Sequence, residues 1–481
     1  MILSDALTEG QIALIMEKTE EILERTGLGV THPVLLARCR QAGARVDEAG
    51  GRVRFPRPVL RELLAAIPAT YTIAGAGGLR HVVGDDTAPT ACLAIVTDPW
   101  IIDYETGEPR RPRLDDLRRH TAIAQALPTV VATSLMDFPL ADMSEPVPGA
   151  AGHAISSLRA MEEWALGHDK HFYNMATDMM RYRHYLALAE ILFDGRDPGG
   201  AAMTVAVGSL SPLACSDLNA DFLLDACSRG FPVVPTVCPI AGMTSPYSVA
   251  GTLLQGNVEV IGMAALTQAV RRGHPYLYAS GLSVGHMRST HDMYYTLDKV
   301  LWKTAAVQLG RAYRMPVAAE CGGSMTHRYD QQNGAEGILF MLGALSSGTH
   351  LLAGIGSTYN AIGMSAEMML VHTAWLASAQ FLRRGIRTDD LRLGVENIER
   401  AGPGGNFLMD DLTLRFLRSD EFFSHELLDY SGGSDPHAPS LLARAHQRAE
   451  QIAASARSPH SEAVQERIRR YFAEEYRKLG A

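Results

Sequence analysis

Short β-branched or aromatic runs alternate with longer helical segments from about residue 128 onward, and this alternation constrains the fold more than any other feature. The predicted strands are residues 130–136, 171–175, 203–210, 232–238, 275–280, 316–320, 349–354 and 405–410. Segments long enough to form a crossover helix lie between most of them. Strict alternation of this kind predicts an α/β protein whose parallel strands close into a (β/α)8 TIM barrel rather than an open sheet.

The two ends of the chain differ from this pattern. Thr8 and Gln11 form a capping box before apolar residues at helical spacing, and two further short helices and a few strands follow. We therefore expect a mainly helical N-terminal domain over residues 1–85 and the barrel over residues 86–420. Residues 421–481 are expected to form a C-terminal helical extension, which ends in a helix of alternating charge exposed to solvent.

Composition excludes several classes of function. The chain has a formal net charge of −9 and no long basic run, which argues against binding to nucleic acid or to an anionic membrane. No signal peptide and no apolar run of about eighteen residues is evident, so we expect a cytoplasmic protein without a membrane span. The six cysteines lack zinc or redox spacing and are predicted to be buried thiols. His168 and His171 lack a third ligand at zinc spacing, so no metal is expected.

Polar residues crowd the segment "MPVAAECGGSMTHRYDQQNGAEG" (315–337) directly after a predicted strand. In a barrel, the loops leaving the C-terminal strand ends carry the chemistry. The alternative is that the two glycines only permit a tight turn and the polar side chains face water. The predicted barrel mouth would gather Glu320, His327, Asp330, Gln332, Glu336, Tyr359 and Asn360, with His350 pointing inward.

Aromatic residues close to these segments suggest a cation site. Trp100, Tyr294, Tyr295 and Trp302 are candidates, because aromatic faces beside a carboxylate hold a quaternary ammonium group by cation–π attraction. The alternatives have equal weight: Trp302 lies in a predicted helix and suits the core, and at most one of the adjacent tyrosines is expected to face the cavity. His350 suits the role of a core histidine equally well.

The order of several long segments indicates a family. The opening "LTEGQIALIMEKTEEILERTGLGVTHP" and the later "IIDYETGEPRRPRLDDL", "GMTSPYSVAGTLLQGNVEVIGMAALTQAVRRGHPYLYAS", "YDQQNGAEG" and "GPGGNFLMDDLTLRFLRS" resemble the trimethylamine methyltransferase superfamily over nearly the whole chain. This resemblance implies a (β/α)8 barrel that moves a methyl group from a methylated amine to the cobalt of a separate corrinoid protein.

The founding members of that family hold a pyrrolysine, whereas this chain contains only the standard residues. It is therefore similar to the pyrrolysine-free branch, which includes glycine betaine:corrinoid methyltransferases. Attack of Co(I) on a methyl of a quaternary ammonium releases a neutral tertiary amine, so the reaction needs no general acid. The enzyme's task reduces to binding the cation, excluding water and aiming one methyl group.

The resemblance also implies a partner protein and a set of site residues. No corrinoid-binding D-x-H-x-x-G motif is present, so cobalamin is expected on a partner corrinoid protein, docked over an apolar rim of the barrel mouth. We hypothesise that Glu320 balances the positive charge of the substrate, that His350 and Tyr359 line the cavity, and that Trp100 or Tyr295 forms a wall. His327, Gln332 and Asp330 complete the expected substrate-binding set.

The sequence is consistent with several carboxylate partners, several activities and an oligomer. A betaine carboxylate needs a partner, and Arg288, His286, His291 and His327 are candidates. The alternatives to methyl transfer are a barrel lyase or hydrolase with a Glu/His acid–base pair, and a non-catalytic binder of quaternary ammonium compounds. A homo-oligomer is expected, with a dimer through the N-terminal domain as the default.

Overall fold

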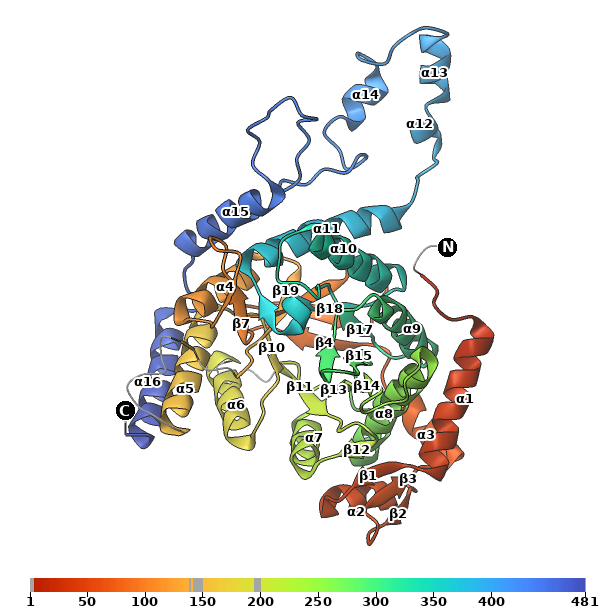
Figure 1. The fold of residues 1–481 in the computed structure, drawn as a ribbon, viewed down its shortest axis with the longest axis vertical. Coiled ribbons are helices and arrows are strands. Elements are labelled where there is room, and N and C mark those ends of the chain that lie inside the picture. The colour runs from red at the N-terminus through yellow and green to blue at the C-terminus, as the bar shows by residue number, and fades with distance from the viewer. Residues whose placement is uncertain (1–3, 138–139, 142–149, 194–199, 481) are drawn as a thin grey trace.

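The computed structural model describes residues 4–137, 140–141, 150–193 and 200–480. Its centre is a curled, seven-stranded parallel sheet surrounded by helices (Figure 1). The spatial order is β13 (Val233–Thr236), β11 (Met203–Gly208), β10 (His171–Asn174), β9 (Val130–Ser134), β6 (Ala91–Ile95), β18 (Leu351–Ile355) and β17 (Ala318–Glu320). The predicted α/β class with parallel strands is confirmed.

Most of the predicted strands are present. Strands β9, β10, β11, β13, β17 and β18 each fall within or against a predicted segment. The predicted strand 275–280 makes only single parallel bridges, from Tyr276 to Val233 and from Tyr278 to Val317. This segment therefore lies between β13 and β17, the two outer strands of the curled sheet.

One predicted strand is wrong, and one strand of the central sheet was missed. Residues 405–410 form an exposed turn, with Leu408 and Met409 about four-fifths exposed. Strand β6 precedes the alternating region and has the sequence ACLAI, in which alanine gives little β propensity. Because it pairs with β9 and β18 in the middle of the sheet, the tertiary fold decides its conformation.

Helices cover the outside of the sheet. They are α4 (Leu114–Ala126), α5 (Ala150–Gly167), α6 (Met179–Phe193), α7 (Asp217–Arg229), α8 (Val249–Val270), α9 (Asp298–Ala312), α10 (Gln331–Ser346) and α11 (Ala366–Arg384). Helix α8 is long and apolar enough to cross a membrane, contrary to the expectation from sequence, but 72% of its apolar window is buried inside the protein. Its apolar surface is therefore satisfied by packing within this fold.

The N-terminal part packs against α8. Helix α1 (Glu9–Arg25) begins with the predicted capping box of Thr8 and Gln11, and α2 (Pro33–Gln41) and α3 (Arg57–Ala65) follow it. All three helices contact α8. A small sheet joins β12 (Ala214–Cys215), β1 (Leu28–Val30), β3 (Arg52–Arg54) and β2 (Arg45–Asp47).

A hairpin of β4 (Tyr71–Ala74) and β5 (Arg80–Val83) covers the N-terminal end of the curled sheet. Its apolar side chains form one buried cluster with side chains that point inward from the sheet. That cluster includes Tyr71, Ile73, Val83, Leu93, Val234, Leu277 and Leu351. The interior is thus filled at this end, and space for a ligand remains toward the other end.

Short strands build the opposite, C-terminal end. One small sheet joins β14 (Ile240–Ala241), β15 (Ser283–His286) and β16 (His291–Met293). Another joins β19 (Ser357–Thr358), β20 (Gly363–Met364), β7 (Trp100–Ile102) and β8 (Pro109–Arg110), with the turn η1 (Tyr359–Ala361) between β19 and β20. These elements form the mouth above the strand ends.

The C-terminal region contains two helices that pack on the body. Helix α15 (Leu441–Ser455) contacts α4 and α11, and α16 (Glu462–Lys478) contacts α5 and α6. The sequence predicted α16 as a solvent-exposed helix, but Ile468 and Phe472 on one of its faces are fully buried. The helix therefore adds to the core as well as to the surface.

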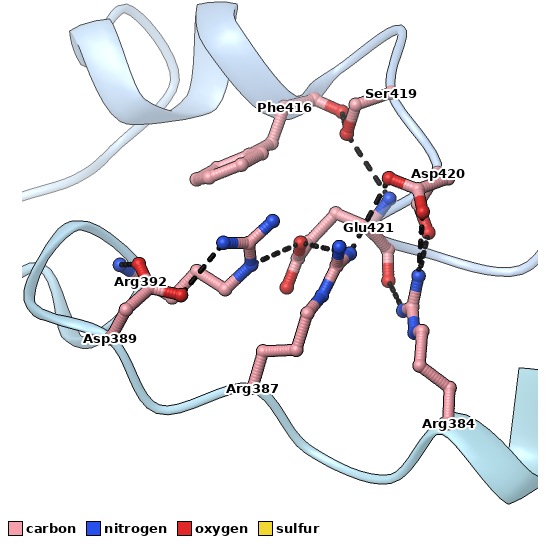
Figure 2. A network of polar contacts seen from close by, with 8 residues as sticks. All are labelled: Arg384, Arg387, Asp389, Arg392, Phe416, Ser419, Asp420 and Glu421. Carbon is pink, nitrogen blue, oxygen red and sulfur yellow. Dashed lines mark hydrogen bonds and ion pairs between the residues drawn. The ribbon is translucent and has the colours of Figure 1, made fainter. Parts of the chain in front are cut away.

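A long arm, residues 385–440, leaves the body between α11 and α15 and carries α12 (Asp390–Leu393), α13 (Val395–Ala401) and α14 (Asp411–Phe416) (Figure 1). Ion pairs join its outgoing and returning segments (Figure 2). Arg387 and Arg392 both contact Glu421 at 2.9 Å, and Arg384 contacts Asp420 at 3.0 Å. A connected set of exposed pairs holds geometry better than isolated pairs do.

Candidate substrate cavity

A cavity of about 350 Å³ opens at the C-terminal ends of the strands. Its floor is apolar, and tyrosines and carboxylates surround its upper part. This volume is at the lower end of the range for small-molecule sites. Its inner end is lined by Leu93, Ala318, Leu351 and Tyr173, and its upper part by Tyr294, Tyr295 and the carboxylates of Asp98, Asp292 and Glu320.

Glu320 ends β17 and lies in the cavity wall as the sequence predicted, but its carboxylate already has partners. It accepts a hydrogen bond from the Tyr294 hydroxyl at 2.9 Å and pairs with the Lys299 ammonium at 3.0 Å. Lys303 donates to the Glu320 main-chain oxygen at 2.6 Å. Both lysines are almost fully buried, so this carboxylate neutralises charge inside the protein.

The surroundings of Glu320 fix its ionisation. Burial by itself would raise the pKa of Glu320, but the ammonium groups of Lys299 and Lys303 outweigh burial and hold that pKa at about 2. Burial lowers the pKa of Lys303 to about 8, although Glu320 opposes this shift. Glu320 is therefore an anion at neutral pH and is poorly suited to exchange a proton with a substrate.

Tyr294 and Tyr295 both line the cavity, which corrects the expectation that only one of them faces it. They lie in an irregular turn between β16 and α9, where the alternation of a strand or the spacing of a helix does not apply. Their rings meet edge to face at 5.3 Å. Two glycines make room for them, because a Cβ on Gly281 would lie 2.4 Å from the Tyr294 hydroxyl and one on Gly323 within 2.2 Å of the Tyr295 ring.

Asp98 is the functional candidate that the sequence analysis missed. It follows β6, lines the cavity and is 6% exposed. No hydrogen bond or ion pair joins its carboxylate to any residue that the structure describes. Burial raises the pKa of Asp98 to about 8. A buried carboxylate without a partner is costly to keep, and a bound cation would supply the missing charge.

Asp292 is the third carboxylate of the cavity, and Asn360 holds its hairpin in place. The Asn360 side chain accepts from the Tyr294 amide at 2.7 Å and donates to the Asp292 main-chain oxygen at 2.6 Å. Asn360 stands in a turn where Tyr359, Asn360 and Ala361 all have left-handed φ values of 47° to 62°. Strained turns of this kind persist where many surrounding contacts hold them in place, and they are common at binding sites.

His350 does not lie in this cavity. It immediately precedes β18, at the end of the sheet that the hairpin covers, and its ring contacts the Asp86 carboxylate at 3.2 Å. Its other ring nitrogen accepts from the Val317 amide at 3.0 Å. The inward orientation expected from the sequence is therefore wrong, because His350 bonds main chain and surface charge instead.

The polar run after β17 mostly builds local structure. Asp330 is the N-cap of α10 and accepts from the Gln332 amide at 3.0 Å. The Gln332 side chain donates to Glu336 at 2.9 Å, and Glu336 in turn accepts from Ser324 at 2.6 Å. These side chains shape the loop below the mouth, and none of them lines the cavity.

The remaining predicted aromatics stand near the cavity without lining it. Tyr359 packs edge to face against His327 at 5.3 Å. Trp100 carries the Arg111 guanidinium over its ring at 4.0 Å. Trp302 is buried and donates to the Val249 oxygen at 2.8 Å, which confirms its core position.

The cavity offers carboxylates and a thiol but no cluster of metal ligands. Among the described residues, no group of three or more His, Cys, Asp or Glu side chains is placed to hold a metal ion. His171 is buried and bonds the Thr204 hydroxyl at 2.9 Å. Five cysteines are buried as expected, whereas the Cys238 side chain is exposed to the space of the cavity. Because the cavity itself lies inside the protein, burial raises the pKa of the Cys238 thiol to about 11.

The fold and the cavity together define a class of protein: an α/β protein whose curled parallel sheet holds, at its C-terminal strand ends, a small apolar and aromatic site with an unpaired carboxylate. Such a site suits a small organic cation. The chain belongs to the trimethylamine methyltransferase (MTTB) family, whose sequence pattern matches residues 2–480.

Relatives of known activity cover nearly all of the chain. It is 28% identical over 461 residues to the glycine betaine methyltransferase of Desulfitobacterium hafniense (strain Y51), which covers 93% of this chain and 92% of the relative. It is 24% identical over 409 residues to the proline betaine:corrinoid methyltransferase of Eubacterium limosum, covering 82% of each. The fold is also similar to the crystal structure of the monomethylamine methyltransferase of Methanosarcina barkeri, with a TM-score of 0.51, 12% identity and coverage of 98% and 87%.

Proposed function

We propose that this protein transfers a methyl group from a quaternary amine to the Co(I) of a corrinoid carried by a partner protein. The observation that carries the proposal is the unpaired, buried carboxylate of Asp98 in a cavity walled by Tyr294 and Tyr295. The named activities of the relatives, which are betaine and corrinoid methyltransferases, support it.

The chemistry asks little of the protein besides placement. Co(I) supplies an electron pair to the methyl carbon, the C–N bond breaks, and nitrogen keeps its bonding pair and leaves as a neutral tertiary amine. No proton has to move. The cavity binds the cation through Asp98 and the tyrosine faces, and its apolar wall keeps water away from the reacting carbon.

The geometry argues against a lyase or hydrolase that uses a Glu/His acid–base pair. Glu320 is held ionised by two lysines, and His350 lies at the opposite end of the strands. A general acid and base must both come within hydrogen-bond reach of one substrate. A pure binder of quaternary ammonium compounds has the same cavity, so the transfer experiment below separates it from the enzyme.

An exposed apolar patch beside the cavity supports the docking of a partner protein. Met243, Tyr247 and Met287 stand on mouth loops and are between 45% and 67% exposed. They lie together, because a Cβ on Gly242 would meet both the Tyr247 ring and the Met287 sulfur within 2.8 Å. Exposed apolar side chains that cluster at the entrance of a site mark an interaction surface, here for the corrinoid protein.

Charge placed on this patch should weaken docking without touching the cavity. We expect Tyr247→Glu to raise the KM for the corrinoid protein about tenfold, the usual effect of losing an aromatic anchor. Methyl transfer to free cob(I)alamin should stay unchanged. Val34→Glu, on α2 and similarly exposed, is the control. Equal effects of the two variants on the protein partner would place the docking surface elsewhere.

Binding of a cation should release a proton. Burial raises the pKa of Asp98 to about 8, so it is mostly protonated at pH 7, and a cation beside it favours the ionised form. Affinity should therefore rise with pH up to about 8. Titration calorimetry at pH 7 in two buffers of different ionisation enthalpy should show close to one proton released. Lys303, whose pKa is also about 8, titrates nearby, so Asp98→Asn must abolish the release if Asp98 is its source.

The proposed enzyme is a closed eight-stranded barrel in which residues 276–278 form the strand between β13 and β17. Main-chain hydrogen bonds support this closure, from the Leu277 amide to the Val233 oxygen at 2.9 Å and from the Tyr278 amide to the Pro316 oxygen at 2.8 Å.

We further propose that the chain consists of an N-terminal domain to residue 85, the barrel to residue 420 and a C-terminal helical extension. We propose a cytoplasmic homo-oligomer.

The test of function mixes the purified protein with reduced free cob(I)alamin and single quaternary amines, and follows the visible spectrum for methylcobalamin. Glycine betaine, carnitine, proline betaine and choline form the panel, and trimethylamine is the control that should fail. We expect methylation from at least one quaternary amine. Tight binding of an amine without methylation, with free cobalamin and with a corrinoid protein, would identify a binder instead.

A further inference from the structure

We propose that the substrate carries a net positive charge: a trimethylalkylammonium whose tail is neutral, such as a hydroxyl or an amide, rather than a carboxylate. This inference rests on the proposed function and narrows its substrate. Among the described residues, three carboxylates line the cavity, and none of its lining residues is Lys, Arg or His. A substrate with a net positive charge complements this negatively charged wall.

The two buried lysines behind the wall are fully engaged. Lys299 donates to the Leu282 oxygen at 2.9 Å, pairs with Glu320 at 3.0 Å and lies 3.1 Å from the centre of the Tyr294 ring. Lys303 donates to the Glu320 oxygen at 2.6 Å and faces the ring of Phe340. Both lysines pair with Glu320, whereas neither Asp98 nor Asp292 has a lysine partner among the described residues. Two ammonium groups therefore face three cavity carboxylates, and one carboxylate charge is left for a substrate cation, which we assign to the buried Asp98.

The floor of the cavity offers no counter-charge for a substrate tail. The corrinoid must approach from the mouth, so the methyl group faces outward and the tail of the substrate lies inward. Leu93, Ala318 and Leu351 form that inner end, together with Tyr173. No hydrogen bond joins the Tyr173 hydroxyl to a described residue, which makes it a neutral partner for a neutral polar tail. Burying a carboxylate against this floor would leave its charge uncompensated.

The cations near the mouth are occupied or turned outward. Arg181 is buried but pairs with Asp137, and Arg111 stacks on Trp100. His327 stands 3.6 Å from the Glu108 carboxylate. The other proposed carboxylate partners, His286, Arg288 and His291, are exposed on the β15–β16 hairpin.

The test compares pairs of compounds that share the trimethylammonium group and differ in the charge of the tail. Glycine betaine is set against its amide and against choline. Calorimetry gives Kd, and methylation of cob(I)alamin gives kcat/KM. We expect the cations to bind and react about 100-fold better or more, since an uncompensated buried carboxylate is strongly disfavoured. A preference for glycine betaine in both measurements would overturn this inference and leave the proposed function standing.

The two proposals fail in different ways. Absence of methylation by every compound, with tight binding of the cations, would refute the transferase and keep the charge selectivity of the site. Asp98→Asn should shrink the cation preference about tenfold or more, because it removes a negative charge that attracts a net cation and repels the carboxylate of a zwitterion. Asp86→Asn makes the same change of charge at the opposite end of the sheet, where Asp86 pairs with Arg311, and should leave the preference unchanged. Equal effects of the two variants would also overturn the inference.

Discussion

Replacing Asp98 by Asn is expected to lower the affinity for a quaternary ammonium substrate by about 100-fold while making the free protein more stable. The loss follows from removing a buried carboxylate of the cavity lining that has neither a pairing lysine nor a hydrogen bond among the described residues. The gain in stability follows because the pKa of Asp98 in the folded protein is about 8, well above its ordinary value.

The sign of the stability effect depends on pH. A raised pKa in the folded state means that the folded protein binds more protons, so wild-type stability falls as pH rises from about 4 to about 8. Thermal melting of the Asp98→Asn variant should therefore match that of the wild type at acid pH and exceed it at pH 8. Asp98→Glu, which keeps the charge, should retain much of the affinity. Lower stability of Asp98→Asn at pH 8 would contradict the proposal that this carboxylate is held ready for a cation.

Replacing Glu320 by Gln is expected to destabilise the fold by about 3–5 kcal/mol, the range seen when one partner of a buried ion pair is removed. Lys299 and Lys303 would be left in the core without their shared counter-charge. Urea unfolding gives the change in free energy. Tyr294→Phe removes only the hydroxyl that donates to Glu320 and should cost about 1 kcal/mol.

A second substitution tests the cause of this loss. Lys299→Met in the Glu320→Gln background removes one of the unpaired ammonium groups and should recover part of the stability, as a coupled pair requires. Unchanged stability of Glu320→Gln combined with lost turnover would instead give Glu320 a direct part in catalysis. Comparing Glu320→Gln with the double variant distinguishes a structural role of Glu320 from a catalytic one.

The fold was largely predictable because parallel strands covered by helices leave a strong alternation in the sequence. Strands β9, β10, β11 and β13 are β-branched or aromatic runs, and the pattern located all four. Strand β6 was missed because its alanine-rich run owes its conformation to pairing with β9 and β18. Residues 405–410 resemble a strand in local sequence, but they lie in the arm, where no neighbouring strand pairs with them.

The site was predictable only where a residue ends a strand. Glu320 follows directly from the position of β17, and the polar nature of the neighbouring loop was correct. His350 was misplaced, because a residue that begins a strand lies at the opposite end of the sheet from one that ends it. Tyr294 and Tyr295 enter the cavity together through an irregular turn, for which the sequence has no periodic signal.

The alternation of strands and helices, the capped first helix, the family and the kind of chemistry could all be inferred from the sequence. These features follow from local residue patterns and from the order of longer motifs along the chain. Which carboxylates of the cavity are paired with a lysine depends on how the chain packs. Glu320 ends one strand and Asp98 follows another, but packing brings two lysines to Glu320 and, among the described residues, none to Asp98. Pairing between residues far apart in the chain sets the charge of the cavity, and linear sequence does not encode it in any local pattern.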